Sequence, residues 1–369
     1  MQLTNYWWLL IWVIVGGFIL DRYMPKETIT VMGKREQRWR LGPAIALVMP
    51  YIVWAGFRAD GFGDTGAYRN SFRNIPSVLS EIPSYLETIT KDKGYSVLAA
   101  ALKLIFGDSD IIFFLILATI QIICLVIVLR KYSSNYWMSI FLFIASTEYL
   151  SWMHNGIRQF TAVMIIFAAT DLILKRKYVP LIGVILLAST IHGSALLMIP
   201  IVFIIQGNAW NKKTVLCIMA SIAVLFFVEQ FTSILDTLLS DTQYTSMVSD
   251  WQSWNDDGTN PIRVFVFSIP TLLSIIGLKI IKHENNPVIN MATNASIITT
   301  GLYLVSMVTS GIFMGRLPIY VSLYSMCILL PWEIENLFTR DSARLVQLIA
   351  SGCYVIFFYY QMHFTWGLI

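Results

Sequence analysis

Residues 110–131, DIIFFLILATIQIICLVIVLRK, decide the kind of fold that this chain can adopt. No charged residue lies between Asp110 and Arg130, and the run is long enough to cross a bilayer core of roughly 30 Å as one helix. Similar apolar runs recur along the 369 residues, which are 56% hydrophobic and 13% charged, whereas soluble domains carry about 25% charged residues. Because the bilayer core has no water to satisfy the backbone, the sequence predicts an all-α polytopic membrane protein.

Lysine and arginine predict the orientation of these helices. The positive-inside rule places the basic segment 22–40 and the pair Arg130–Lys131 in the cytoplasm. Segment 232–260 carries five aspartates and no lysine or arginine, so it is predicted outside, together with segment 58–109. Within 58–109, the stretches SVLSEIPSYLETI and YSVLAAALKLIFG have helical spacing with polar faces and predict amphipathic helices at the membrane interface.

The apolar run 178–206 is too long for one ordinary span and short for two. The sequence IHGS, residues 191–194, lies at its centre. A single helix here would reverse the side of every later loop, against the charge bias. We therefore expect a hairpin of two short helices with His192 at its outer apex. This gives about twelve crossings, both ends outside, in one integral membrane domain over residues 1–369.

Composition excludes several classes of function. The net charge of +4 is small and scattered, which argues against nucleic acid as a partner. The four cysteines lie in apolar runs without a CxxC pair, so they predict neither a metal site nor disulfides. No phosphate-binding loop, GxSxG or HExxH motif is present. We therefore expect no cofactor and no metal, and a lipid-linked substrate would need neither.

Arginines gather at the predicted outer ends of the helices. Arg158, Arg263 and Arg316 lie in the first turn of a predicted helix, and Arg58 follows the second helix. The helix dipole opposes a cation there by about 0.3–1 kcal/mol, whereas free N–H groups and the dipole favour an anion. Since the guanidinium group donates in a fork that fits phosphate, these residues predict a site for an anion such as a diphosphate.

Other readings of these arginines stay open. Arg158 could be an interfacial side chain that reaches a lipid phosphate. Arg263 could pair with Asp256 or Asp257. Three such arginines on the side where positive charge is scarce favour the anion site.

Two histidines and an aspartate lie on the same predicted side. Imidazole titrates near working pH, so His192 is a candidate general base, or else a hydrogen-bonded core histidine. Asp64, in the stretch RADGFGDTGAY, is the alternative base, or else a turn residue beside glycines. His154 is a candidate substrate contact, or else a solvated interfacial residue.

The order of several stretches resembles the EpsG-like branch of the Wzy polysaccharide polymerases, over about residues 50–335. These stretches are FRADGFGDTGAY (57–68), KGYSVLAAALKLIFG (93–107), NGIRQFTAVMIIFAA (155–169), LLASTIHGSALLMIPI (186–201) and GRLPIYVSLY (315–324). In the first, the family's arginine, glycine, aspartate and tyrosine correspond to Arg58, Gly63, Asp64 and Tyr68. Asp60 is an extra acid, and His154 is not part of the family's pattern.

The resemblance implies an inverting glycosyltransferase related to the GT-C class. Such enzymes join undecaprenyl-diphosphate-linked oligosaccharide repeat units on the outer face of the bacterial cytoplasmic membrane. The growing chain leaves its lipid diphosphate and is transferred to a sugar hydroxyl of the incoming unit. The implied partners are this lipid-linked substrate, the lipid bilayer and a chain-length regulator.

We assign expected roles to the outer residues on this basis. Arg158 and Arg316 would bind the leaving diphosphate, helped by Arg58. His192 or Asp64 would act as the general base. The expected substrate contacts are Tyr68, Gln159, His154, Arg263 and Tyr95, with Trp152, Trp251 and Trp254 as further rings that could stack on sugars.

Two other functions would use the same arginines. A flippase for lipid-linked oligosaccharides also has to face a lipid diphosphate, but it should carry charge at mid-membrane and on both sides. The later helices lack such buried charge, which favours a one-sided enzyme. An O-antigen ligase performs the same chemistry on a different acceptor, and the sequence separates it poorly from a polymerase.

Overall fold

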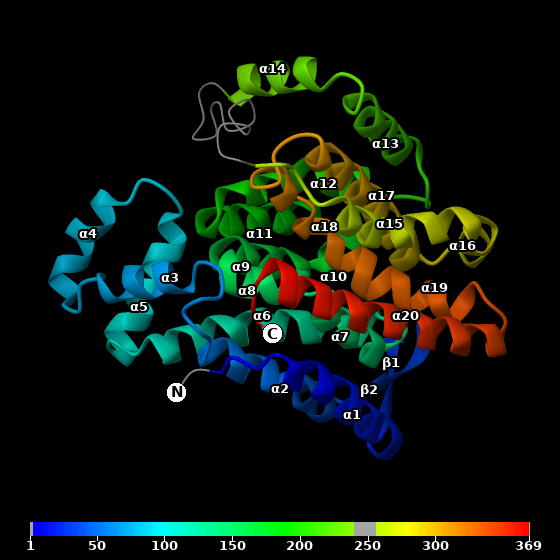
Figure 1. Ribbon diagram of the computed structural model, residues 1–369, viewed down its shortest axis with the longest axis horizontal. Helices are drawn as coiled ribbons and strands as arrows, with labels where there is room; N and C mark the ends of the chain where they lie inside the picture. Colours follow the sequence, from blue (N-terminus) through cyan, green and yellow to red (C-terminus); the bar gives the residue numbers. More distant parts are fainter. Residues whose placement is uncertain (1–2, 240–255, 369) are drawn as a thin grey trace. The chain divides into compact units, whose positions relative to one another are not determined.

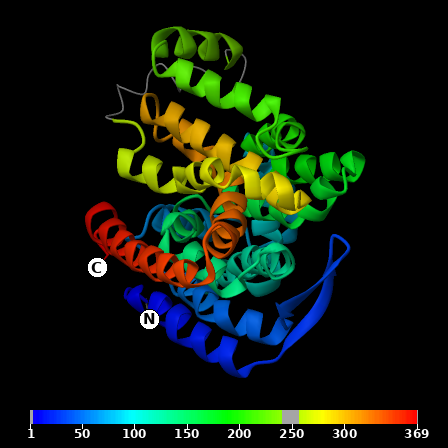
Figure 2. The same cartoon turned by 90° about the vertical axis from the view of Figure 1, so that its right-hand side faces the viewer.

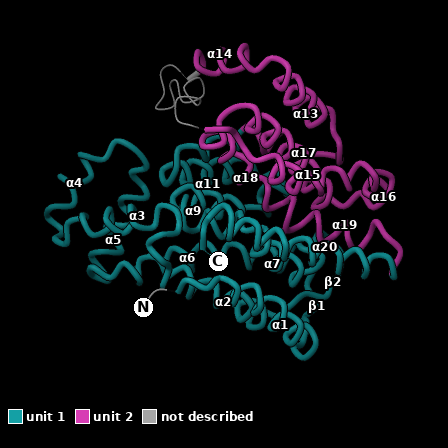
Figure 3. Tube along the Cα trace, in the orientation of Figure 1, with its two compact units in different colours: residues 1–199, 341–369 teal, residues 200–340 magenta. Residues whose placement is uncertain are grey.

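The computed structural model describes residues 3–239 and 256–368 and is almost entirely helical (Figure 1). The helical class predicted from the sequence is therefore confirmed. The chain divides into two compact units, one of Met1–Ile199 with Asp341–Ile369 and one of Pro200–Arg340 (Figure 3). We call them unit 1 and unit 2. The division into two compact units does not test the prediction of a single membrane domain, which stays a prediction.

Unit 1 begins with two apolar helices, α1 (Trp7–Tyr23) and α2 (Leu41–Gly56). Helix α1 packs against α2 and against α7 (Tyr136–Ala145). Indole groups tie them together: Trp12 donates to the Leu47 carbonyl at 3.0 Å, and Trp137 donates to the Val13 carbonyl at 2.8 Å. A Cβ at Gly17 would collide with the Trp137 indole, so this small residue allows the close helix approach typical of membrane proteins.

Between α1 and α2 the chain forms an antiparallel hairpin of β1 (Lys26–Val31) and β2 (Lys34–Trp39), which extends beside the helices in Figure 2. Its turn residues Met32 and Gly33 have φ values of 49° and 85°, the two positive values of a type I′ turn. The sequence analysis expected only a basic loop here. The strands form because KETITV ends in four β-branched residues, with Ile29 and Val31 on the less exposed face, before a two-residue turn.

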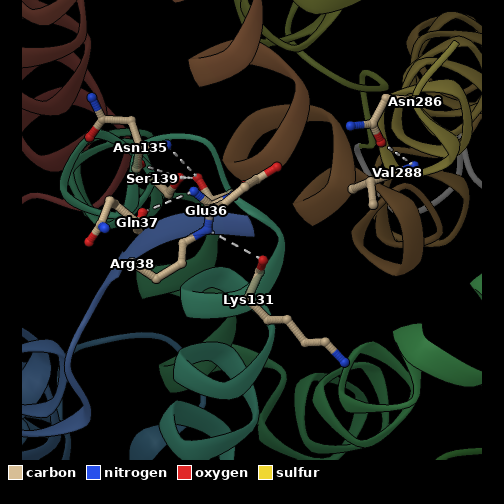
Figure 4. Close-up of polar contacts among 9 residues, drawn as sticks. Glu36, Gln37, Arg38, Lys131, Asn135, Ser139, Asn286 and Val288 are labelled. Atoms are coloured by element: carbon tan, nitrogen blue, oxygen red, sulfur yellow. Dashed lines mark hydrogen bonds and ion pairs between the residues drawn. The ribbon is translucent and has the colours of Figure 1, made fainter. Parts of the chain in front are cut away.

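The hairpin is attached to the end of α6 (Asp110–Tyr132). Arg38 donates to the carbonyl of Lys131 at 3.5 Å (Figure 4), and Glu27 forms an ion pair with Arg130. The two basic segments that the charge pattern places on one side of the membrane therefore lie together in the structure.

The segment 58–109 is mostly helical, as its amphipathic stretches predict. Its elements are α3 (Thr65–Arg73), η1 (Leu79–Glu81), α4 (Ile82–Thr88) and α5 (Lys93–Phe106). In α5, Lys103 is 2% exposed and donates to the carbonyls of Phe72 at 3.2 Å and Arg73 at 2.6 Å. A cation at a helix C-terminus satisfies its last carbonyls, so Lys103 joins α5 to the end of α3.

The apolar runs 136–150 and 156–174 each predict one continuous helix, but both helices are broken. The predicted helix 136–150 is α7 followed by α8 (Glu148–Asn155), with Thr147 at φ 58° between them. The predicted helix 156–174 is α9 (Ile157–Ala168) followed by α10 (Thr170–Leu174). A left-handed conformation at a β-branched residue is rare, and no local pattern in the sequence predicts it.

The predicted hairpin at 178–206 does break at His192. Helix α11 (Tyr178–Ile191) ends there, and η2 (Gly193–Leu197) and α12 (Met198–Ile204) follow. The backbone of His192 is extended, and η2 packs against α11. The position of the break thus agrees with the sequence.

Unit 2 is built around α17 (Pro287–Met307), which is mostly buried. The Asn294 amide of α17 donates to the carbonyls of Ile205 and Asn208, at 3.0 Å each, and so holds the helix to the loop after α12. The other elements of this unit are α13 (Lys212–Val224), α14 (Val228–Leu239), α15 (Pro261–Ile276), α16 (Leu278–Glu284), η4 (Met314–Arg316), α18 (Ile319–Tyr324), the π-helical turn η5 (Ser325–Leu329) and α19 (Leu330–Asn336).

The end of the chain returns to unit 1 as α20 (Arg340–Tyr360) and η6 (Gln361–Thr365). The Phe358 ring of α20 lies 5.3 Å, centroid to centroid, from the Trp7 ring of α1. The first and last helices are therefore neighbours within unit 1.

Helix length and composition indicate a membrane protein. Four helical runs in the described chain are long and apolar enough to span a bilayer: α6, α17, Met314–Asn336 and Arg340–Thr365. The pairs α13–α14, bent by 113°, and α15–α16, bent by 72°, raise this to six if each pair is one span. Shorter apolar helices accompany them. The predicted twelve crossings and the GT-C architecture are not confirmed by these helices.

Candidate functional site

Arg158 lies in the first turn of α9, two residues after the junction with α8. The chain turns at Gly156, where a Cβ would collide with the Trp152 ring. The Arg158 side chain is 41% exposed, and its Nη1 lies 2.9 Å from Oδ2 of Asp92. In this structure the arginine therefore already holds an anion, and that anion is a carboxylate of the same chain.

Asp92 joins two segments that are far apart in the sequence. It lies immediately before α5 in a left-handed conformation, with φ 54° and ψ 44°. Its Oδ2 accepts from Arg158, and its Oδ1 accepts from the Gly193 backbone N–H at 3.3 Å. A Cβ at Gly94 would collide with Thr190, so the start of α5 is in close contact with the end of α11. Asp92 thus links the first turn of α9 to the break after α11.

Two tyrosines predicted to contact substrate lie beside this pair. The Arg158 guanidinium carbon is 5.9 Å from the centroid of the Tyr95 ring, close enough for a cation–π contact. The side chain of Tyr68 hydrogen-bonds Arg158, and the Tyr68 and Tyr95 rings meet edge to face at 6.4 Å. The structure therefore brings Arg158, Tyr68 and Tyr95 together around Asp92.

His192 is the residue next to Gly193, at the break after α11. Its Nδ1 lies 2.7 Å from Oγ of Ser194, and the side chain is half-buried. A base whose ring is oriented by a second polar group is a common arrangement for proton transfer. His192 is thus next in sequence to one of the two donors that hold the Asp92 carboxylate.

The glycine-rich turn packs against the junction of α8 and α9. Gly63 has φ 55°, and a Cβ there would lie 2.7 Å from the Cβ of Asn155. The turn therefore contacts a residue that lies three positions before Arg158 in the sequence. Asp64 is exposed at the N-cap of α3, and its side chain makes no capping hydrogen bond. Its carboxylate is therefore open to solvent.

Arg58 and His154 lie beneath this turn rather than on its surface. Arg58 is 1% exposed, donates to the Met153 carbonyl at 2.7 Å and lies 4.3 Å from the Phe114 ring centroid. Burial lowers the pKa of Arg58 to about 10, so it stays a cation at neutral pH. His154 is fully buried and stacks on Phe62 of the turn at 4.2 Å. Both side chains support the turn, and the binding roles assigned to them stay predictions.

The remaining expected contacts are spread over both units. Gln159 is 3% exposed in unit 1, next to Arg158. In unit 2, Arg316 is half-buried at the end of η4, and the guanidinium carbon of Arg263 lies 5.6 Å from the Tyr303 ring centroid. Trp251 and Trp254 lie outside the described residues.

Asp256 holds the loop that precedes Arg316. Its carboxylate accepts from Ser310 Oγ at 2.7 Å and from the backbone N–H groups of Gly311 at 3.0 Å, Ile312 at 2.9 Å and Gly258 at 3.0 Å. Burial raises the pKa of this carboxyl, but the four hydrogen bonds outweigh burial and hold the pKa below its usual value. The sequence analysis treated Asp256 as an outer-loop acid or a partner for Arg263 and did not predict this contact.

Gly258 allows this loop contact, and replacing it should break the loop apart. Its φ is 78°, and a Cβ would lie 2.5 Å from the Met307 carbonyl and 3.0 Å from those of Ser306 and Thr309. Backbone carbonyls cannot move aside as side chains can. We expect Gly258→Ala to lower the free energy of unfolding by about 2–4 kcal/mol. Thermal unfolding in detergent measures this, with Gly42→Ala, at an open position, as the control. Equal melting of both variants would contradict the prediction.

Within the described ranges, no group of three or more histidine, cysteine, aspartate or glutamate side chains could hold a metal ion. The arrangement that the described residues do form is a cationic one. In unit 1, an arginine at a helix N-terminus and a backbone N–H hold one carboxylate, and a tyrosine hydrogen-bonds the arginine. Such a set of donors can bind an anionic group with two oxygens.

The sequence pattern did not point to Asp92, and it predicted no loop contact for Asp256 of unit 2. Asp92 lies inside the stretch TKDKGY, just before the predicted glycine–aromatic helix. An aspartate directly before a helix is a capping signal, but nothing local tells which distant arginine it meets.

Comparison with known proteins gives one match. The family model described as the EpsG family matches residues 43–367, which is nearly the whole chain. No curated protein and no solved structure matches it.

Proposed function

Because the chain belongs to the EpsG family, we propose that it is a polysaccharide polymerase that acts on undecaprenyl-diphosphate-linked oligosaccharide repeat units. It would work at the outer face of the bacterial cytoplasmic membrane and transfer the growing chain to a sugar hydroxyl of the incoming unit. The observation that carries this proposal is Arg158 at the start of α9, which contacts Tyr68, Tyr95 and the Asp92 carboxylate. Gly193, the residue after His192, donates its backbone N–H to the same carboxylate.

Arg158 is the residue that we propose for the leaving diphosphate. As the bond between the anomeric carbon and the phosphate oxygen breaks, its electron pair stays on the diphosphate, where negative charge grows. Arg158 and the free N–H groups of the first turn of α9 would stabilise that charge. Arg58 would act from beneath the turn as a buried supporting charge, and the role of Arg316 as a second cation stays a prediction from the sequence.

His192 is our choice for the general base. The acceptor hydroxyl oxygen forms the new bond to the anomeric carbon, and its proton would pass to the imidazole, with inversion at that carbon. The contact with Ser194 orients the ring for this transfer. Asp64, exposed at the start of α3, is the other candidate for the proton. Tyr68, Tyr95, Gln159 and His154 of unit 1 would contact or support the substrate, and the contact expected of Arg263 stays a prediction from the sequence.

The test is a glycan ladder in a host that lacks this gene but carries its polysaccharide pathway. Wild type should restore long chains, and His192→Gln should lower polymer formation by about 10²–10⁴-fold at equal protein level, leaving single repeat units at the surface. The matched control is His283→Gln in α16, an exposed histidine that should keep the full ladder.

Other outcomes would point elsewhere. A full ladder from well-expressed His192→Gln would remove His192 as the base, and loss of the ladder in Asp64→Asn would then assign that role to Asp64. Absence of any surface repeat from the host without the gene, restored by wild type, would favour a flippase over a polymerase.

A further inference from the structure

The carboxylate of Asp92 is held by two donors from separate elements. One is the guanidinium of Arg158 in α9, and the other is the backbone N–H of Gly193 at the start of η2. Each donor takes a different oxygen of the same carboxylate. A phosphoryl group also presents two oxygens side by side, so the same donors can hold it in the same way.

The contacts of Asp92 would allow another anion to replace its carboxylate at Arg158. The Arg158 side chain is 41% exposed, so an incoming anion can reach it, and the hydrogen bond to Gly193 is long at 3.3 Å. The Asp92 side chain itself is 10% exposed, so it has to rotate away when another anion takes its place at Arg158. A diphosphate carries more negative charge than one carboxylate and would compete well for the same donors.

Positive charge around Asp92 exceeds what the aspartate neutralises. Lys91 and Lys93 flank it in sequence, and both are exposed. Together with Arg158 they put three cations near one carboxylate. Such an excess attracts a multiply charged anion to the site.

We infer that the Asp92 carboxylate occupies the position that one phosphoryl group of the substrate takes when it binds. The lipid diphosphate displaces this carboxylate and binds Arg158 and the Gly193 N–H in its place. This inference rests on the proposed function and extends it by naming a positioning residue. While no substrate is bound, the ion pair with Asp92 holds the Arg158 side chain at the first turn of α9. Its removal should therefore strengthen binding of the diphosphate, which a purely structural ion pair would not predict.

The experiment measures the affinity of the purified full-length protein in detergent for undecaprenyl diphosphate by calorimetry. Asp92→Asn should bind roughly fivefold more tightly than wild type, because one competing charge is gone. Arg158→Gln should bind at least about tenfold more weakly. In the Asp92→Asn, Arg158→Gln double variant the gain should vanish, since Asp92 acts through Arg158.

Two further variants keep the test decisive. Asp92→Gly removes the carboxylate and suits the backbone φ of 54°, so it covers the case in which Asp92→Asn folds poorly. Asp60→Asn removes an exposed carboxylate of the neighbouring turn and should leave the affinity unchanged.

The possible failures are distinguishable. Unchanged or weaker binding by both Asp92 variants, with wild type binding normally, would overturn the inference and make the pair a permanent structural bridge. Absence of binding by wild type and all variants would overturn the proposed substrate, and the inference with it.

Discussion

Replacement of Arg158 by glutamine should reduce polymer formation by about 10²–10³-fold while the protein still reaches the membrane in normal amount. The reason is electrostatic: the glutamine amide can still donate hydrogen bonds, but it carries no positive charge to stabilise the leaving diphosphate. The side chain is part-exposed and contacts one carboxylate and two tyrosines, so its loss should disturb the fold little. The measurement is the glycan ladder, quantified against protein level by blot.

Two variants sharpen this result. Arg158→Lys keeps the charge but loses the planar fork, so it should retain part of the activity, between wild type and Arg158→Gln. Arg344→Gln changes an exposed arginine at the start of α20 and should leave the ladder intact. Long chains made by well-expressed Arg158→Gln would show that Arg158 is an interfacial anchor and that the site lies elsewhere.

Replacement of Asp256 by alanine should lower the free energy of unfolding by about 3 kcal/mol. The carboxylate accepts four hydrogen bonds, three of them from backbone N–H groups at Gly258, Gly311 and Ile312. Alanine leaves these donors without their acceptor and frees the loop before Arg316. Thermal unfolding in detergent measures the loss, and Asp257→Ala, at an exposed neighbour, is the matched control.

The same carboxylate predicts a pH dependence. Its pKa is lower in the folded protein than in the unfolded chain, so the ionised form stabilises the fold at neutral pH. That stabilisation is present above about pH 4 and is lost as the pH falls through the folded-state pKa. The stability difference between wild type and Asp256→Asn should therefore be largest near pH 7 and shrink below about pH 4. A difference that stays constant down to pH 3 would show that charge is not what holds this loop.

Some of the fold followed from local pattern, and some did not. The apolar run of α6, the amphipathic stretch of α5 and the break at His192 are each visible in a short window of sequence. The β1–β2 hairpin and the kink at Thr147 were missed, although the hairpin has an alternating pattern and a glycine turn. The many basic residues in that segment favoured a loop, so its strand pattern was not recognised.

The sequence by itself determined the class of the protein, its family and the individual residues Arg158, His192, Tyr68 and Tyr95 as candidates. These depend on hydrophobicity, charge and short motifs, which are properties of neighbours along the chain. Only the tertiary structure decided that Arg158 meets Asp92, that Arg58 is buried, and that Asp256 holds the loop before Arg316. Such contacts join residues tens of positions apart, and which partners meet depends on how the helices pack, because a buried or paired charge is stabilised by geometry that no local pattern encodes.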